Sequence, residues 1–184
     1  MGLTRRTHNI VSQHFAGREK GIAVDATCGN GFDTEFLAQL GFKKVFSFDV
    51  QEKAIVSSRQ RLSQAGYSNT QFILEGHENL KLHIKEPIDC AMFNFGYLPN
   101  ADKDITTTSN TSIAALDAAL SLLSNNGLVT LLCYPGHPQG AVETDAIKGW
   151  LNKLSSAWTV ETHLASAPKP MAPLLFVVKG SQAL

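Results

Sequence analysis

The feature that most constrains the fold of this sequence is a regular alternation of short apolar runs with helical segments. Runs typical of buried strands occupy residues 21–26, 44–50, 70–74, 88–96 and 128–134. Helical patterns occupy residues 4–16, 33–41, 51–66, 77–84 and 111–127. Such an alternation favours parallel strands joined by right-handed crossovers. We therefore predict an α/β fold, a doubly wound Rossmann-like sheet covered by helices on both faces.

The C-terminal part departs from this alternation. A helical pattern at residues 141–156 is followed by two strand-like runs, at 158–165 and 173–180, and the proline-rich segment 166–173 joins them. Because proline suits hairpin loops and not central strands, this spacing predicts a terminal antiparallel hairpin. The sheet is thus expected to be mostly parallel with an antiparallel end, and a length of 184 residues favours one domain, 1–184.

Composition limits where the protein acts and what it binds. Sixteen basic and sixteen acidic residues give zero formal net charge, so any polyanion must be bound by a local patch of basic side chains. The three cysteines, Cys28, Cys90 and Cys133, lack metal-ligand spacing, which predicts no metal site and a reducing environment. With neither a signal-peptide pattern nor a membrane-length apolar run, we expect a cytoplasmic protein without a membrane partner.

The stretch VDATCGNGFDT, residues 24–34, follows the first predicted strand, where open α/β sheets bind ligands. Gly29 and Gly31 allow a tight turn and a close approach of the backbone to a ligand. Thr34 stands where the dinucleotide fingerprint requires Gly or Ala, which disfavours a nicotinamide cofactor. Asp49 lies 20 residues after Gly29, the spacing at which a carboxylate meets ribose hydroxyls. We predict a nucleoside-like ligand; the alternative is an ordinary structural turn.

A second informative stretch, NFGYLPNADKDITT, residues 94–107, follows the fourth predicted strand. The side-chain oxygen of Asn94 can accept a hydrogen bond from an amine and so orient its lone pair. The ring of Tyr97 offers an aromatic face to a base or a cationic centre. The alternative is a turn in which Asn94 satisfies backbone groups and Tyr97 packs.

Several segments between about residues 20 and 145 carry a resemblance to a known family, namely DATCGNGFDT, FDVQ, GHENL, FNFGYLPNADKDITT and YPGHPQGAVE. They resemble the small class I S-adenosylmethionine-dependent methyltransferases that have been grouped as rRNA methylases. Asn94 to Tyr97 also resemble the Asn/Asp-Pro-Pro-Tyr motif of amino-group methyltransferases, with Phe95 and Gly96 in place of the prolines. The resemblance implies the class I methyltransferase fold and S-adenosylmethionine as cofactor. It further implies methylation of the aminomethyl group of 5-aminomethyl-2-thiouridine at the wobble position, in the anticodon stem-loop of tRNA.

The resemblance also implies roles for individual residues. Those implied to bind the cofactor are Asp25, Gly29, Asn30, Gly31, Asp33, Asp49, Gln51 and His77. From the chemistry of the implied amine substrate we assign three catalytic residues: Asn94 orients the amine, Tyr97 stacks on the base or borders the methyl group, and Asp102 accepts a proton or anchors the amine. The alternatives are a structural histidine for His77 and a solvated turn carboxylate for Asp102.

Three other functions stay open from the sequence. The same cofactor site suits a methyltransferase of rRNA or of a small-molecule amine, and it also suits a non-catalytic nucleoside-binding module. His137, after the fifth predicted strand, either caps backbone groups or borders the substrate pocket. The sequence does not decide between a monomer and a homodimer.

Overall fold

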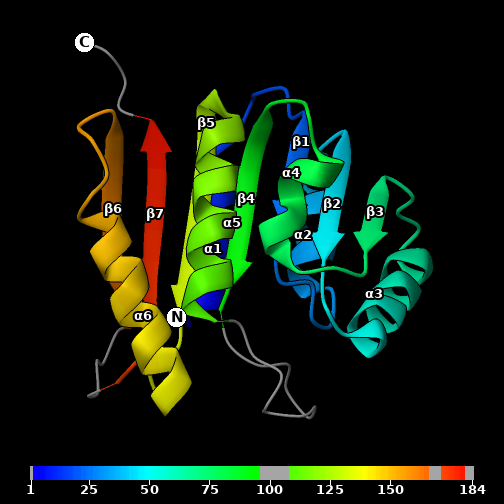
Figure 1. Cartoon of the computed structure of the whole chain (residues 1–184). Helices are drawn as coiled ribbons and strands as arrows, with labels where there is room; N and C mark the ends of the chain where they lie inside the picture. Colours follow the sequence, from blue (N-terminus) through cyan, green and yellow to red (C-terminus); the bar gives the residue numbers. More distant parts are fainter. Residues whose placement is uncertain (1, 96–107, 166–170, 181–184) are drawn as a thin grey trace.

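A computed structural model describes residues 2–95, 108–165 and 171–180. Within them, seven strands form one sheet in the order β3-β2-β1-β4-β5-β7-β6 (Figure 1). The strands are β1 (Ile22–Asp25), β2 (Lys44–Phe48), β3 (Thr70–Ile73), β4 (Ile88–Asn94), β5 (Leu123–Cys133), β6 (Trp158–Leu164) and β7 (Leu174–Gly180). Strands β1 to β5 pair in parallel, whereas β7 is antiparallel to both β5 and β6. The predicted mostly parallel sheet with a C-terminal antiparallel hairpin is confirmed.

Helices cover both faces of this sheet, as the alternation predicts. One face carries α1 (Leu3–His14), α2 (Phe32–Gln39) and α3 (Glu52–Gln64). The other carries the 3-10 turn η1 (His77–Asn79), α4 (Leu80–His83), α5 (Ser109–Leu122) and α6 (Pro138–Leu151). Among the described residues, each helix is too short or too polar to span a bilayer.

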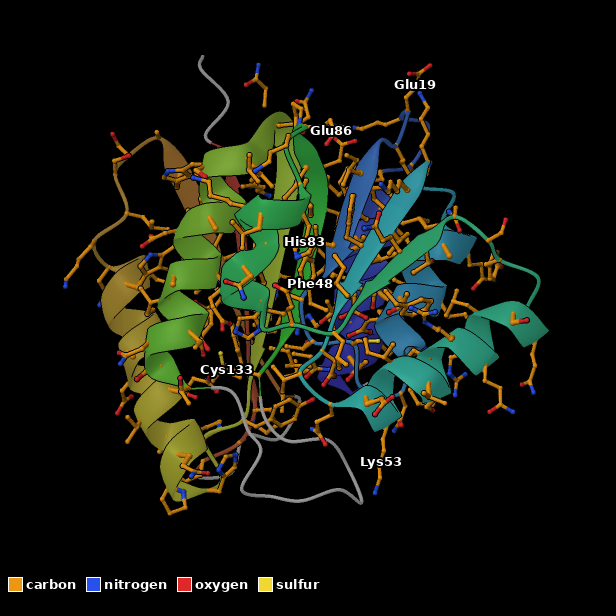
Figure 2. All side chains as sticks on the ribbon, turned by 45° about the vertical axis from the view of Figure 1, so that its right-hand side comes forward. Glu19, Phe48, Lys53, His83, Glu86 and Cys133 are labelled. Carbon is orange, nitrogen blue, oxygen red and sulfur yellow. The ribbon has the colours of Figure 1, made fainter. Side chains whose placement is uncertain are left out.

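Each face of the sheet has its own apolar layer. Under α1, α2 and α3 the buried side chains include Val11 and Leu37, and under α4, α5 and α6 they include Leu116 and Ile147. Figure 2 shows Phe48 of β2 beside His83 of α4, with ring centroids 5.8 Å apart. Because both layers are apolar, polar side chains that could bind a ligand or take part in catalysis are sought at the ends of the strands.

Several predicted boundaries are wrong; the helix expected to end at residue 156, for example, ends at Leu151. The helix expected at residues 111–127 ends at Leu122, and β5 begins at once with Leu123. The helix expected from residue 141 already begins at Pro138, because His137 caps it by accepting from the Gly140 N–H at 3.1 Å. Proline at the first helical position suits such a start, since it has no N–H to leave unsatisfied.

Candidate active site at the carboxyl ends of the strands

The candidate site lies at the carboxyl ends of β1, β2 and β4. The strand order reverses between β1 and β4, and open α/β sheets bind ligands at such a point. The loop after β1 is joined to both neighbouring strands. The Cys28 N–H donates to the Phe48 carbonyl at 2.8 Å, and the Asn94 N–H donates to Thr27 Oγ1 at 2.8 Å. The segments that the sequence analysis singled out after the first and fourth strands are therefore in direct contact.

The glycine loop, residues 28–31, requires its glycines for conformation and for space. Gly29 has φ of 52° and Gly31 has φ of 77°, the left-handed region that favours glycine. The Ser58 hydroxyl of α3 donates to the Gly29 carbonyl at 3.0 Å. A Cβ on Gly31 would lie 2.8 Å from Ser58 Cβ and 3.0 Å from Ser58 Cα, so α3 packs directly on this turn.

Gly31→Ala is expected to lower the free energy of unfolding more than Gly66→Ala does. Gly66 has a nearly equal φ, 79°, but open space around the position of a Cβ. The backbone strain common to both variants costs about 1 kcal/mol. Gly31→Ala should cost a further ~1 kcal/mol or more, because it also forces α3 away from the loop. Urea unfolding of both variants measures the difference, and equal losses would contradict the close packing.

Asp25 ends β1 and lies beneath the loop, fully buried. Its Oδ2 accepts from the Thr34 hydroxyl at 2.6 Å, and its Oδ1 accepts from the Thr27 N–H at 3.1 Å. Burial, and next the nearby charge of Asp33, raise the pKa of Asp25 to about 7, although the Thr34 hydrogen bond opposes this. Asp25 thus hydrogen-bonds to Thr27 and Thr34, which lie on either side of the glycine loop. A direct contact between its side chain and the cofactor stays a prediction.

Asp25→Asn is expected to reduce the loss of stability that occurs as the pH rises from 5 to 8. The folded-state pKa of about 7 exceeds the ordinary value of 3.8, so the folded state binds the extra proton between these values. Stability therefore falls as pH rises through this window and levels off above it. Between pH 5 and pH 8 the wild type should lose on the order of 2 kcal/mol more than Asp25→Asn in urea unfolding. Asp145→Asn, at an exposed position on α6, is the control for the effect of replacing any carboxylate on stability. If the wild type and Asp25→Asn lose the same stability between pH 5 and pH 8, the raised pKa of Asp25 is contradicted.

Asp49 joins the loops that follow β1 and β2. Its Oδ2 accepts from the Gly29 N–H and its Oδ1 from the Gln51 N–H, both at 2.9 Å. Burial raises the pKa of Asp49, while these two N–H groups act in the opposite direction. The spacing of 20 residues between Gly29 and Asp49 therefore corresponds to a contact in the structure. Each carboxylate oxygen keeps a further lone pair for a hydroxyl donor.

His77 is the first residue of η1, which follows β3 after a short loop, and its side chain is buried. Its Nδ1 lies 3.0 Å from the Ala26 carbonyl, so Nδ1 carries the proton and Nε2 is an acceptor. Nε2 is buried without a partner among the residues described. Burial lowers the pKa of His77, which favours this neutral ring. A neutral acceptor next to the β1 loop suits the amino group of a ligand.

Two further predicted residues lie just before α2 and in its first turn. Asp33 in the first turn of this helix contacts His8 of α1, with 2.6 Å between Asp33 Oδ1 and His8 Nε2. The Asn30 carbonyl accepts from Arg61 Nε at 2.8 Å. The Arg61 guanidinium also lies 3.8 Å from the centre of the Phe32 ring. Side chains from α3 therefore hold the loop, and His8 of α1 holds the first turn of the helix that follows it.

The predicted catalytic residues are described only in part. Asn94 is the last residue of β4 and is half-buried, beside Thr27 of the β1 loop. Tyr97 and Asp102 lie outside the described residues, and their roles stay predictions. The structure thus brings Asn94 together with the predicted cofactor residues Asp25, Gly29, Asn30, Gly31, Asp33, Asp49, Gln51 and His77 at one edge of the sheet.

Comparison with known proteins identifies the family. A family model described as "Putative rRNA methylase" matches residues 45–179. The chain belongs to this family. The match begins later and ends later than the segment of about 20–145 that carries the resemblance, so it extends through the C-terminal hairpin.

Three relatives define the similarity further. The chain is 32% identical over 165 residues to an Arabidopsis thaliana protein named tRNA (mnm(5)s(2)U34)-methyltransferase, chloroplastic; the match covers 83% of this chain but only 60% of that relative. It is 32% identical to a crystal structure described as a "putative rRNA-methylase" from Clostridium thermocellum, with a TM-score of 0.90 over 97% of both chains. A Streptococcus mutans protein described as "a putative methyltransferase" in complex with SAH is 33% identical, with a TM-score of 0.88 over 98% of this chain and 99% of that one. The predicted class I methyltransferase fold is confirmed.

The residues that support the site from beneath and beside it were not predicted from the sequence. They are His8, Thr27, Ser58 and Arg61, together with Thr34, which was read only as an argument against nicotinamide. Thr34 is fully buried, donates to Asp25, and lies 2.8 Å from the Ser47 hydroxyl of β2. The first turn of α2 also contains Asp33 and Glu35, so a third polar residue there gave no sign that Thr34 would be buried.

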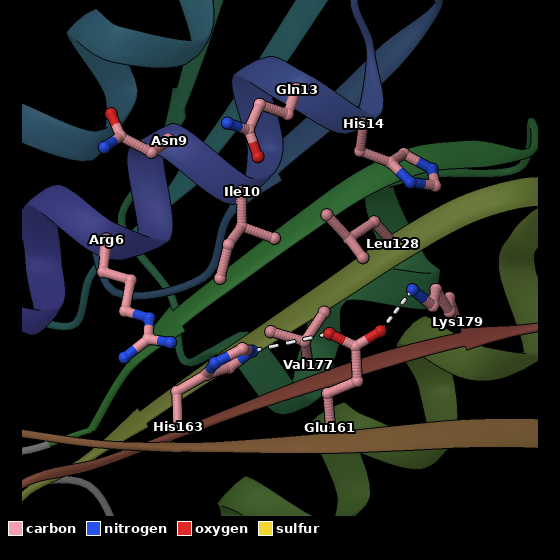
Figure 3. A pocket seen from close by; sticks show the side chains of 10 residues that line it. All are labelled: Arg6, Asn9, Ile10, Gln13, His14, Leu128, Glu161, His163, Val177 and Lys179. Atoms are coloured by element: carbon pink, nitrogen blue, oxygen red, sulfur yellow. Dashed lines mark hydrogen bonds and ion pairs between the residues drawn. The ribbon is translucent and has the colours of Figure 1, made fainter.

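A separate cavity of about 550 Å³ lies between α1 and the β6–β7 hairpin (Figure 3). Its floor is apolar, with Leu128 and Val177, and Glu161 forms ion pairs with Lys179 and His163 along one wall. This charge network joins β6 to β7, and the cavity contains no residue of the glycine loop. Among the described residues, no group of three or more His, Cys, Asp or Glu side chains could hold a metal ion.

Proposed function

We propose that the protein transfers a methyl group from S-adenosylmethionine to the aminomethyl group of 5-aminomethyl-2-thiouridine at the tRNA wobble position, giving 5-methylaminomethyl-2-thiouridine. At the coarser level the chain is an S-adenosylmethionine-dependent methyltransferase, because it belongs to the family above and shares the fold of a relative in complex with SAH. The substrate is supported by the name of the Arabidopsis relative. The observation that carries the amine specificity is the position of Asn94 beside the glycine loop.

The described residues fit S-adenosylmethionine, which supplies an electrophilic methyl group. Asp49 would accept from the ribose hydroxyls with the lone pairs that Gly29 and Gln51 leave free. The unpartnered Nε2 of His77 would accept from the adenine amino group. The backbone of the glycine loop and Asp33, at the positive end of α2, would bind the amino-acid end of the molecule.

The chain must present the substrate amine without a proton, because only the neutral amine has a lone pair. Burial of the aminomethyl group in the crevice disfavours its charged form. The side-chain oxygen of Asn94 would accept one N–H of the amine and so direct its lone pair at the methyl group. Stacking by Tyr97 and proton acceptance or amine anchoring by Asp102 complete the proposal.

Contact with tRNA would come from a local basic patch, because the chain has zero net charge. Arg5 and Arg6 are exposed on α1, and Lys53 is exposed at the start of α3, at the edge of the sheet where the strands end (Figure 2). These side chains lie outside the loops that bind the cofactor in this proposal. They would therefore position the RNA without taking part in methyl transfer.

The proposal is tested by methyl transfer from labelled S-adenosylmethionine to tRNA that carries 5-aminomethyl-2-thiouridine. Digestion and mass spectrometry should show the methylaminomethyl nucleoside, and the same tRNA with unmodified uridine at the wobble position should gain no label. Methylation of rRNA, as the family description suggests, or of a free amine in place of this tRNA would retain the coarser function and reject the substrate. Absence of methylation of all three would favour a non-catalytic nucleoside-binding module.

A further inference from the structure

The contact between His8 and Asp33 joins the first helix of the chain to the first turn of α2, directly after the glycine loop. The two atoms, His8 Nε2 and Asp33 Oδ1, are 2.6 Å apart although the residues are 25 positions apart in the sequence. The Asp33 side chain is 11% exposed and the His8 side chain 25% exposed, so water competes little for the bond. With the proton on Nε2, His8 donates to the carboxylate.

The His8 ring is also fixed from its other side. It stacks on Phe36 of α2, with ring centroids 3.9 Å apart and planes 2° from parallel. Phe36 lies three residues after Asp33, so one helical turn of α2 supplies both the surface on which the ring stacks and the acceptor for its nitrogen. The helix that carries His8 is anchored by Val11 and Phe15, both buried. The direction of the His8 N–H is therefore set by packing on two helices.

We propose that His8 is a positioning residue of the cofactor site. It holds Asp33 Oδ1, so that Oδ2 faces the amino-acid end of S-adenosylmethionine and accepts from its ammonium group. This inference rests on the proposed cofactor site, and it adds α1 to that site.

The test compares two ligands and three variants by calorimetry. S-adenosylmethionine has the amino-acid end, whereas 5′-methylthioadenosine shares the adenosine but lacks it. His8→Ala should weaken S-adenosylmethionine binding about tenfold and leave 5′-methylthioadenosine binding unchanged. His8→Gln, whose side-chain amide can donate from a similar place, should recover most of the loss. His14→Ala is the matched control, because His14 is the last residue of α1 and contacts the Asn126 carbonyl, away from the glycine loop.

Each outcome bears on a separate statement. Equal weakening of both ligands by His8→Ala would show that His8 only supports the fold of α1 and would overturn the inference. Unchanged S-adenosylmethionine affinity would overturn it as well. If the wild type binds 5′-methylthioadenosine but not S-adenosylmethionine, the proposed cofactor site itself is wrong, whatever His8 does. Selective loss with recovery by His8→Gln supports the inference.

Discussion

Asn94→Ala is expected to lower methyl-transfer turnover about a hundredfold while S-adenosylmethionine affinity stays close to that of the wild type. The proposed contact of the Asn94 side chain orients the amine for attack, so its loss acts on the transition state and not on cofactor binding. The backbone N–H of Asn94 donates to Thr27 in a bond that the substitution retains. Single-turnover transfer to modified tRNA and calorimetry with the cofactor measure the two quantities separately.

Asn94→Gln is the matched variant for this prediction. It keeps the amide but moves it by one methylene group, so turnover should stay low if direction of the lone pair is what Asn94 supplies. Turnover near wild type in Asn94→Ala would reject the role. An equal loss of cofactor affinity would instead make Asn94 a cofactor ligand. Tyr97→Ala should differ from both by weakening RNA binding, because base stacking contributes about 1 to 3 kcal/mol.

Most of the fold could be predicted because periodicity and glycine positions are local signals. Helix α2 is followed by Gly41 and α3 by Gly66, the last residues of the two predicted helical segments, and both have positive φ. The segment Ser124 to Gly127 was misread as the end of a helix. It forms an irregular part of β5, where the register with β4 shifts between Ile88 and Cys90. Asp89 fixes it by accepting from the Ser124 hydroxyl at 2.7 Å, a contact that no local pattern reveals.

The candidate site could be located from the sequence but not fully assembled. Strand ends predict where ligand-binding loops meet, and the pairing of Gly29 with Asp49 followed from a known spacing. His8 and Ser58 contact the site only because α1 and α3 pack beside α2. Their partners are 25 and 29 residues away, and the packing that brings them together is decided by apolar side chains elsewhere on those helices.

Asp49→Ala is expected to weaken S-adenosylmethionine binding ten- to a hundredfold. The variant removes the charged acceptor proposed for the ribose hydroxyls, and a hydrogen bond of this kind contributes roughly 1.5 to 3 kcal/mol. It also leaves the N–H groups of Gly29 and Gln51 without their acceptor, so both loops lose part of their alignment. Asp49→Asn should be impaired too, because an amide can present only one acceptor oxygen to the two N–H groups.

Asp89→Ala separates a cofactor effect from general destabilisation. Asp89 likewise accepts from a backbone N–H, that of Gly21 at 2.6 Å, and from a side-chain hydroxyl, but it lies at the opposite end of the sheet. Its loss should lower the free energy of unfolding and leave cofactor affinity unchanged. Calorimetry on the folded variants therefore decides the role of Asp49. Equal cofactor affinities in Asp49→Ala and Asp89→Ala would remove Asp49 from the site. A loss of affinity in Asp49→Ala alone would place the ribose next to Asp49, where the loops after β1 and β2 are joined.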